Sequence, residues 1–281
     1  MSTPMTQTPF GSRLHDALSE RGQLCAGIDP HASLLHAWGL EDSAAGLERF
    51  ALTAVEAIAP LVSVVKPQSA FYERHGSRGV AVLERVIQES RAAGALVLLD
   101  VKRGDIGSTS QAYADAYLDP ASPLATDAVT ASPFLGFGSL TPMIDTARKH
   151  GAGVFVLALT SNKEGPEVQH ATTDAGRTVA GTILEQLRNL NTGADPLGSF
   201  GAVVGATIGD TEESFDIDGP ILAPGYGAQG GTVADLRRIF GRSAHRVLAS
   251  SSRELLSPGP EPRALRDGVL RAQDDLSGLT A

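Results

Sequence analysis

The sequence has 281 residues, of which 42% are hydrophobic, and a formal net charge of −9, a length that suits one α/β barrel or two average domains. Such an acidic chain lacks the basic face that general binding to nucleic acid or to an anionic membrane requires. Its one cysteine, Cys25, excludes an internal disulfide and a thiolate metal cluster, and we expect it to be a small buried hydrophobe.

We do not expect a signal peptide at the start of the chain, because no basic residue precedes Arg13 and no apolar core lies there. The longest strongly apolar run, residues 154–159, is far shorter than the roughly 20 residues that cross a bilayer. We therefore expect a soluble, cytoplasmic protein.

Short apolar runs alternate with segments of helical periodicity along the chain. The expected strands cover residues 24–28, 62–68, 96 to about 102, 127–131, 154–160, 202–206, 221–223 and 247–250. The expected helices cover residues 13–21, 46–59, 79–93, 140–149, 178–190 and 233–240. Eight strands separated by helices, without hairpin signals, predict parallel βαβ units that close into a single (β/α)8 TIM barrel.

The barrel is expected to form one domain over residues 1–281, with a polar lead at 1–12 and a tail at 258–281. Within the tail, residues 263–276 are amphipathic and are expected to pack as a helix or to fray. We assign the tail no function.

Charged side chains stand where two of these strands end. Asp100 and Lys102 follow an apolar run, and the alternation of side chains along a strand puts both on one side. Lys66 ends the preceding strand in the same way, whereas Asp105 follows a glycine, where the turn leaves its direction open. An ordinary ion pair needs only two charges, so this set favours a functional site at the carboxyl ends of the barrel strands.

A glycine-rich loop at residues 224–231 follows the seventh strand and precedes an expected helix. Glycines such as Gly225, Gly227 and Gly230 let backbone N–H groups approach an anion, and the helix amino end favours negative charge. Arg253, after the eighth strand, offers a planar fork for phosphate oxygens. Loops at these two positions often hold phosphate in barrels, so we favour a phosphate site over a merely flexible turn.

Taken together, the motif Asp100-x-Lys102-x-x-Asp105, Lys66 upstream and the loop 224–231 resemble the orotidine 5'-phosphate decarboxylase family. The segments 27–30 (GIDP) and 66–73 (KPQSAFYE) resemble its longer bacterial branch, and the similarity covers roughly residues 10 to 260. The resemblance implies a barrel enzyme, without metal or organic cofactor, that converts orotidine 5'-monophosphate to uridine 5'-monophosphate in de novo pyrimidine biosynthesis.

The resemblance also implies roles for individual residues. Lys102 would stabilise and then protonate a carbanion at C6 of the pyrimidine, beside Asp100, which would oppose the departing carboxylate. Asp105 and Thr109 would reach the partner's site, so a homodimer is implied. The full implied array of catalytic charges is Lys66, Asp100, Lys102 and Asp105. The implied substrate contacts are Asp29 to ribose, Ser161 to the pyrimidine, Gln229 and Arg253 to phosphate, and Thr109.

Some choices stay open at this point. Asp29 could instead cap the helix that follows Pro30, and either Thr160 or Ser161 could face the ring. The seven histidines lack the HxH and HxxxH spacings of zinc sites, so we expect no metal ligands among them. His31, close to Asp29, is kept only as a remote candidate.

Three other functions are weighed against the decarboxylase. A magnesium-dependent sugar-phosphate lyase or synthase of the same barrel superfamily, such as a hexulose-phosphate synthase, would use the Asp-x-Lys-x-x-Asp array to hold the metal. A second ammonium at Lys66 would crowd such a cation. A Schiff-base aldolase needs a lysine of lowered pKa, which neighbouring carboxylates oppose. A non-catalytic nucleotide-phosphate binder would not require four alternating charges.

Overall fold

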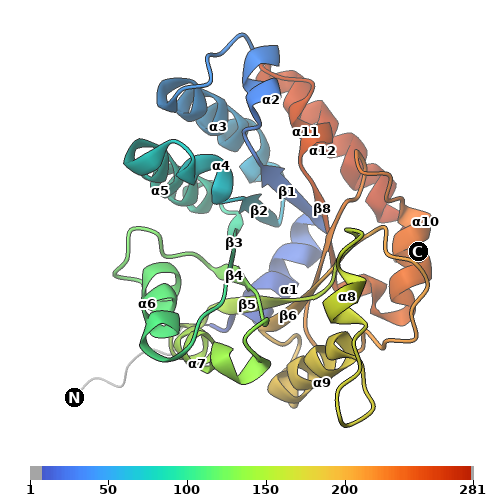
Figure 1. Cartoon of the computed structure of the whole chain (residues 1–281). Helices are drawn as coiled ribbons and strands as arrows, with labels where there is room; N and C mark the ends of the chain where they lie inside the picture. Colours follow the sequence, from blue (N-terminus) through green and yellow to red (C-terminus); the bar gives the residue numbers. More distant parts are fainter. Residues whose placement is uncertain (1–7, 280–281) are drawn as a thin grey trace.

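The computed structural model describes residues 8–279, and its eight parallel strands close into one barrel in the order β1 to β8 (Figure 1). Each strand pairs with its sequence neighbours, and β8 pairs with β1 to close the ring. The prediction of a single (β/α)8 barrel is therefore confirmed. The strands are β1 Leu24–Ile28, β2 Val64–Pro67, β3 Leu96–Arg103, β4 Ala128–Ala131, β5 Gly153–Leu159, β6 Phe200–Val204, β7 Ile221–Pro224 and β8 Val247–Ser251.

Helices on the outside of the barrel connect most of the successive strands (Figure 1). Their bounds are α1 Phe10–Arg21, α2 Ala32–Ala37, α3 Ala44–Ile58, α4 Ala70–Glu73, α5 Gly76–Ala92, α6 Gly107–Leu118, α7 Thr141–His150, α8 Pro166–Gln169, α9 Val179–Asn191, α10 Val233–Phe240, α11 Arg253–Leu256 and α12 Pro262–Ser277. Short 3-10 helices cover Ala59–Leu61, Phe137–Leu140 and Gly241–Arg246. The described stretch 205–220, between β6 and β7, contains no helix.

Helix α10 has the predicted bounds because its first turn is capped by side chains. The Thr232 hydroxyl accepts a hydrogen bond from the Asp235 N–H, and the Asp235 carboxylate accepts one from the Thr232 N–H. This reciprocal pair satisfies two donors that the helix itself leaves unpaired. The cap fixes where the helix begins directly after the glycine-rich loop.

Helix α6 was not predicted. Its sequence, GSTSQAYADAYL, mixes small, polar and aromatic residues around the helix, so it shows only a weak apolar stripe. The residues that it buries are Ser110, Ala114, Tyr117 and Leu118. With so few buried residues, the helix is stable only because it packs against the rest of the barrel.

The polar lead is shorter than expected, whereas the tail packs as a helix, one of its two expected states. Residues 1–7 of the lead lie outside the described residues, and Phe10, fully buried, already belongs to α1. The tail forms the regular helix α12, which buries Leu265 and Val269 and packs against α3. Of the helices in the described part of the chain, none is long and apolar enough to cross a membrane.

The core has two layers, as the alternation of strand side chains requires. Between strands and helices lies the larger cluster, and a smaller one fills the barrel interior with Cys25, Leu98 and Phe155 among its members. Cys25 is fully buried, as predicted, and burial raises the pKa of its thiol to about 12. The interior is thus a packed core, and ligands are left to the ends of the strands.

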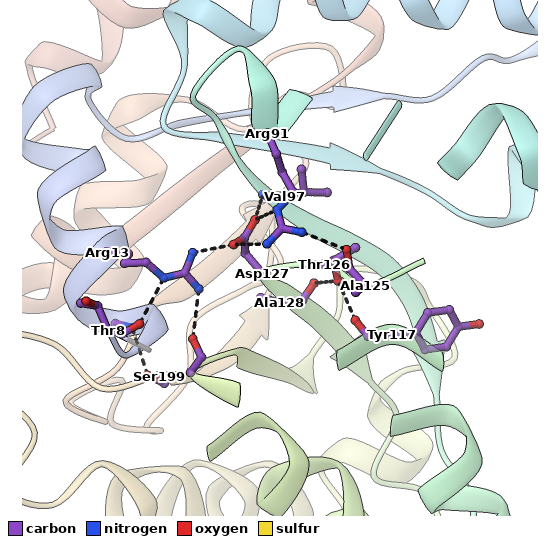
Figure 2. Close-up of polar contacts among 12 residues, drawn as sticks. Thr8, Arg13, Arg91, Val97, Tyr117, Ala125, Thr126, Asp127, Ala128 and Ser199 are labelled. Carbon is purple, nitrogen blue, oxygen red and sulfur yellow. Dashed lines mark hydrogen bonds and ion pairs between the residues drawn. The ribbon is translucent and has the colours of Figure 1, made fainter. Parts of the chain in front are cut away.

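Helix α1 closes the amino-terminal end of the barrel around a buried carboxylate (Figure 2). Asp127 is 3% exposed and pairs with Arg13 at 2.5 Å and with Arg91 at 3.4 Å. Its second oxygen accepts a hydrogen bond from the Val97 N–H at 2.9 Å. This network joins α1, α5 and two strands at the end of the barrel opposite to the charged strand tips.

Candidate active site

The carboxyl ends of the strands surround a cavity of about 390 Å³. Its walls contain apolar side chains such as Leu157 and Val203 beside charged groups from four strand ends. The structure brings together most of the residues that the sequence suggested. Those that line the cavity are Asp29, Lys66, Asp100, Lys102, Ser161, Gly225, Gln229 and Arg253.

At the bottom of the cavity, Asp100 lies between two lysines. Its carboxylate is 2.7 Å from the Lys102 ammonium and 3.4 Å from the Lys66 ammonium. Lys66 and Asp100 are buried, whereas the Lys102 side chain is 44% exposed toward the cavity mouth. Lys102 is therefore the charged group of this trio that an incoming ligand can reach most freely.

Neighbouring charges keep both Lys66 and Asp100 ionised. Burial opposes ionisation of Asp100, but Lys66 and Lys102 outweigh it and lower the pKa of that carboxyl to about 2. Burial would likewise lower the pKa of Lys66, yet the carboxylates of Asp29 and Asp100 raise it above the usual lysine value. Lys66 and Asp100 are thus both ionised at neutral pH.

Lys102 owes its position to an irregular strand end. Between the pairs Leu99–Val129 and Arg103–Ala131, β3 advances by four positions while β4 advances by two. The extra residues place Lys102 at φ 46°, in the left-handed backbone region that residues other than glycine rarely adopt. Plain alternation predicted the correct side for Lys102, but the bulge sets the actual geometry.

Thr130, from β4, secures this arrangement and was not predicted. Its hydroxyl donates to Asp100 at 2.7 Å and accepts from the Lys102 backbone N–H at 2.9 Å. One side chain thus orients both the carboxylate and the strained backbone of its neighbour. A polar residue inside the short buried strand 128–131 was the signal available in the sequence.

Asp29 lies on the other side of Lys66 and does not cap a helix. It is 6% exposed and accepts a hydrogen bond from the Gln68 N–H at 3.1 Å, and α2 has no side-chain cap. The capping alternative is therefore wrong. Asp29, Lys66, Asp100 and Lys102 form a row of alternating charge along the cavity.

Asp105 and Thr109 do not line the cavity of their own chain. The Asp105 carboxylate accepts a hydrogen bond from the Ile106 N–H, and Thr109 is exposed at the start of α6. Neither residue contacts the row of charges that contains Lys102 through a hydrogen bond or ion pair within the described chain. Within one chain, the fourth charge of the row comes from Asp29 and not from Asp105.

The glycine-rich loop contributes Gly225, Ala228 and Gln229 to the cavity lining, and Arg253, after β8, lines the same cavity. Gly227 and Gly230 lie on its outer side, and their N–H groups donate to carbonyl oxygens of the loop itself, at Gly231 and Gly227. Gly225, Gly227 and Gly230 all have positive φ values. These glycines therefore shape the loop, while the Gln229 and Arg253 side chains face the ligand space.

Ser161, and not Thr160, has its hydroxyl available. The Thr160 hydroxyl donates to Asn162 and accepts from Gln169, which also accepts from the Thr160 N–H. Ser161 has no side-chain hydrogen bond within the described chain. The geometry thus favours Ser161 for a ligand contact.

Two further cavity residues escaped sequence reasoning. The Ser252 hydroxyl is buried without a hydrogen-bond partner in the described chain and lies beside Gly27 and Asp29. Phe71 lines the mouth and packs against His31 at 4.2 Å between ring centroids. Among residues 8–279, no group of three or more His, Cys, Asp or Glu side chains could hold a metal ion.

A (β/α)8 barrel with two ammonium groups, two carboxylates and a glycine-rich loop at its mouth defines a class of barrel enzymes that act on anionic, phosphate-bearing substrates. The chain belongs to the Orotidine 5'-phosphate decarboxylase / HUMPS family, whose model matches residues 22–255.

The chain is also similar to individual proteins over nearly its whole length. It is 71% identical to an orotidine 5'-phosphate decarboxylase of Nocardioides sp. over 95% of this chain and 98% of the relative. The corresponding protein of Streptomyces coelicolor is 62% identical, over 94% and 95% of the two chains. A crystal structure from Streptomyces avermitilis, described as an orotidine 5'-phosphate decarboxylase, superposes with a TM-score of 0.97 at 57% identity and covers both chains completely.

Proposed function

We propose that the protein decarboxylates orotidine 5'-monophosphate to uridine 5'-monophosphate and carbon dioxide in de novo pyrimidine biosynthesis. The observation that carries the proposal is the row of alternating acidic and basic side chains in which the Asp100 carboxylate lies 2.7 Å from the Lys102 ammonium at the bottom of the cavity. Two relatives above 60% identity that bear the name of this enzyme support it.

The chemistry requires positive charge next to C6 of the pyrimidine. When the bond from C6 to the carboxylate breaks, the electron pair stays on C6 and carbon dioxide leaves. The Lys102 ammonium stabilises that pair and then gives C6 its proton. Asp100 faces the substrate carboxylate, and their repulsion falls as carbon dioxide departs. Lys66 holds Asp100 ionised through the reaction.

The remaining cavity residues orient the nucleotide. Gln229 and Arg253 bind the phosphate beside the glycine-rich loop, Asp29 accepts hydrogen bonds from the ribose hydroxyls, and Ser161 contacts the pyrimidine. Phosphate binding far from C6 supplies energy that orders the loop and aligns the reacting carbon. No metal or organic cofactor takes part in this scheme.

The working form in this proposal is a homodimer in which Asp105 and Thr109 complete the partner's site. Support comes from their exclusion from the cavity of their own chain and from the apolar side chains around them. Ile106 is 62% exposed and Phe134 76% exposed, on neighbouring segments after β3 and β4. Burying such a patch against a second copy is favourable. The enzyme is expected to work in the cytoplasm, where nucleotides are made.

Incubation of the purified protein with orotidine 5'-monophosphate, followed by ultraviolet absorbance with and without EDTA, tests this function. Conversion to uridine 5'-monophosphate at an equal rate under both conditions is expected. Conversion of a sugar phosphate that EDTA abolishes would instead favour the magnesium-dependent relative. Binding of uridine nucleotide without any turnover would favour a non-catalytic binder.

A further inference from the structure

Within the described residues, one side-chain hydrogen bond joins the glycine-rich loop to helix α12. The Tyr226 hydroxyl donates to the Asp275 carboxylate at 2.5 Å. Tyr226 is 6% exposed and borders both the active-site cavity and a shallow groove on the outer side of the loop. Within the described chain, no other side chain of residues 224–231 forms a hydrogen bond to a different element.

Helix α12, which carries Asp275, is firmly attached to the barrel. In Figure 1 it runs along the outside of the barrel, and its carboxyl end lies near α10. It buries Leu265, Val269 and Leu276. The Gln273 amide donates to the carbonyl oxygens of Arg21 and Leu61 at 3.1 and 2.6 Å. A hydrogen bond to this helix therefore holds its partner in place relative to the barrel.

Asp275 is an unusual residue for its place. It lies in the last turn of α12, where the helix dipole disfavours negative charge. The carboxylate of Glu254 borders the same groove. Burial and these two carboxylates raise the pKa of Tyr226, so its hydroxyl stays protonated and can donate to Asp275. The hydrogen bond offsets part of the cost of an acid at this helix end.

The loop behaves as one closed unit. The Gly227 N–H donates to the Gly231 carbonyl, the Gly230 N–H to Gly227, and the Gly231 N–H to Gly225, at 2.7 to 3.0 Å. Because these bonds tie the loop to itself, the position of Tyr226 determines where Gln229 lies. The hydrogen bond at Tyr226 thus influences the position of Gln229, the loop side chain that faces the ligand.

We propose that the Tyr226–Asp275 hydrogen bond makes helix α12 a positioning element for substrate phosphate, an inference that rests on the proposed decarboxylase function. Neither hydroxyl nor carboxylate touches the reacting carbon in this scheme. Their effect is to hold the glycine-rich loop, and Gln229 with it, in the conformation that binds the phosphate group.

Steady-state kinetics with orotidine 5'-monophosphate and with orotidine, which lacks the phosphate, test the inference. Tyr226→Phe and Asp275→Ala should each raise KM for the nucleotide roughly tenfold, the effect of losing one charge-assisted hydrogen bond. Asp275→Ala should change kcat/KM for orotidine by much less. The KM of the double variant should be no higher than that of the more severely affected single variant, because both substitutions remove the same hydrogen bond.

Asp274→Ala is the matched control, since it removes an acid from the adjacent position of the same helix without touching the loop. An active wild-type protein whose Asp275→Ala variant keeps the wild-type KM would overturn the inference. So would equal losses on both substrates, because the pair would then support the fold and not the phosphate site. A wild-type protein that converts neither substrate would instead contradict the proposed function.

Discussion

Lys102 combines an exposed ammonium with a constrained backbone. Its φ of 46° costs about 1–2 kcal/mol relative to an ordinary strand conformation. The hydrogen bond from its N–H to Thr130 and the ion pair with Asp100 hold it there. Strain that surrounding contacts maintain is typical of a functional position. The bulge places the lysine where its ammonium meets both Asp100 and the open cavity.

Lys102→Ala should therefore abolish most of the turnover and leave nucleotide binding largely intact. We expect kcat to fall at least about 10⁴-fold, because the change removes both charge stabilisation and the proton donor. The dissociation constant for uridine 5'-monophosphate, measured by calorimetry, should change by no more than about tenfold. Lys149→Ala, on the exposed face of α7, controls for loss of a lysine. Unchanged turnover in Lys102→Ala would remove that residue from the mechanism.

The charge state of Asp100 gives a pH prediction. Its pKa in the fold, about 2, lies below the usual value of 3.8, so its ionisation contributes about 2 kcal/mol of stability above pH 4. That contribution is lost as the pH falls from about 4 toward 2. Asp100→Asn should thus destabilise the protein most at neutral pH, by at least this amount, because Lys66 also loses a partner.

Urea unfolding of the wild type and of Asp100→Asn between pH 7 and pH 3 measures the difference. We expect it to be constant from about pH 7 to 5 and to narrow below about pH 4. Asp16→Asn, an exposed acid on α1 with no side-chain partner in the described chain, should show neither effect. A difference that does not vary with pH would mean that Asp100 is not kept ionised by the fold.

At the scale of elements, periodicity predicts the barrel well and its irregular parts poorly. Strand β1 matched its predicted bounds because Leu24–Ile28 is a continuous buried run. Helix α6 was missed because its helical form depends on packing that a weak apolar stripe does not reveal. The β3 bulge and the Thr130 contact depend on the register between β3 and β4, which no property of either strand alone specifies.

The same limit applies to the site. Residue type and strand position sufficed to place Lys66, Asp100 and Arg253 at the cavity, since the parallel strands of a barrel all end at one face. They could not separate Thr160 from Ser161, because the choice depends on the Gln169 side chain nine positions away. Ser252 gave no signal, because an unpaired hydroxyl is a property of three-dimensional surroundings.

Helix α1 gives a prediction that separates stability from activity. Asp127→Asn should lower the free energy of unfolding by about 2–3 kcal/mol, because Arg13 and Arg91 lose their shared carboxylate in a buried site. The kcat of the folded variant should stay unchanged, since the network drawn in Figure 2 shares no residue with the cavity lining and lies at the amino-terminal end of the strands. Thermal unfolding and kinetics on one preparation check both parts, and a large loss of kcat would show that the two ends are coupled.

At the scale of the whole molecule, the two ends of the barrel differ in what they bury and what they expose. The amino-terminal end buries its charge in a closed network around Asp127. The carboxyl-terminal end of the barrel leaves Ile106, Phe134 and Leu135 exposed in the segments that follow β3 and β4. Apolar side chains of this size on adjacent segments are costly in water unless a partner covers them. This end is accordingly where the proposed second copy of the chain would bind.

Subunit mixing tests whether Asp105 acts across that interface. Lys102→Ala and Asp105→Asn should each be nearly inactive alone. In a hybrid dimer, the subunit with Asp105→Asn keeps its own Lys102 and receives an intact Asp105 from its partner, so one of the two sites is complete. Random exchange makes half of the dimers hybrid, so co-refolding equal amounts should restore about a quarter of wild-type activity.

If Asp105 serves the site of its own chain, neither hybrid site is complete and the mixture stays inactive. Lys102→Ala mixed with Lys102→Ala/Asp105→Asn should stay inactive in both cases, because every subunit lacks the lysine.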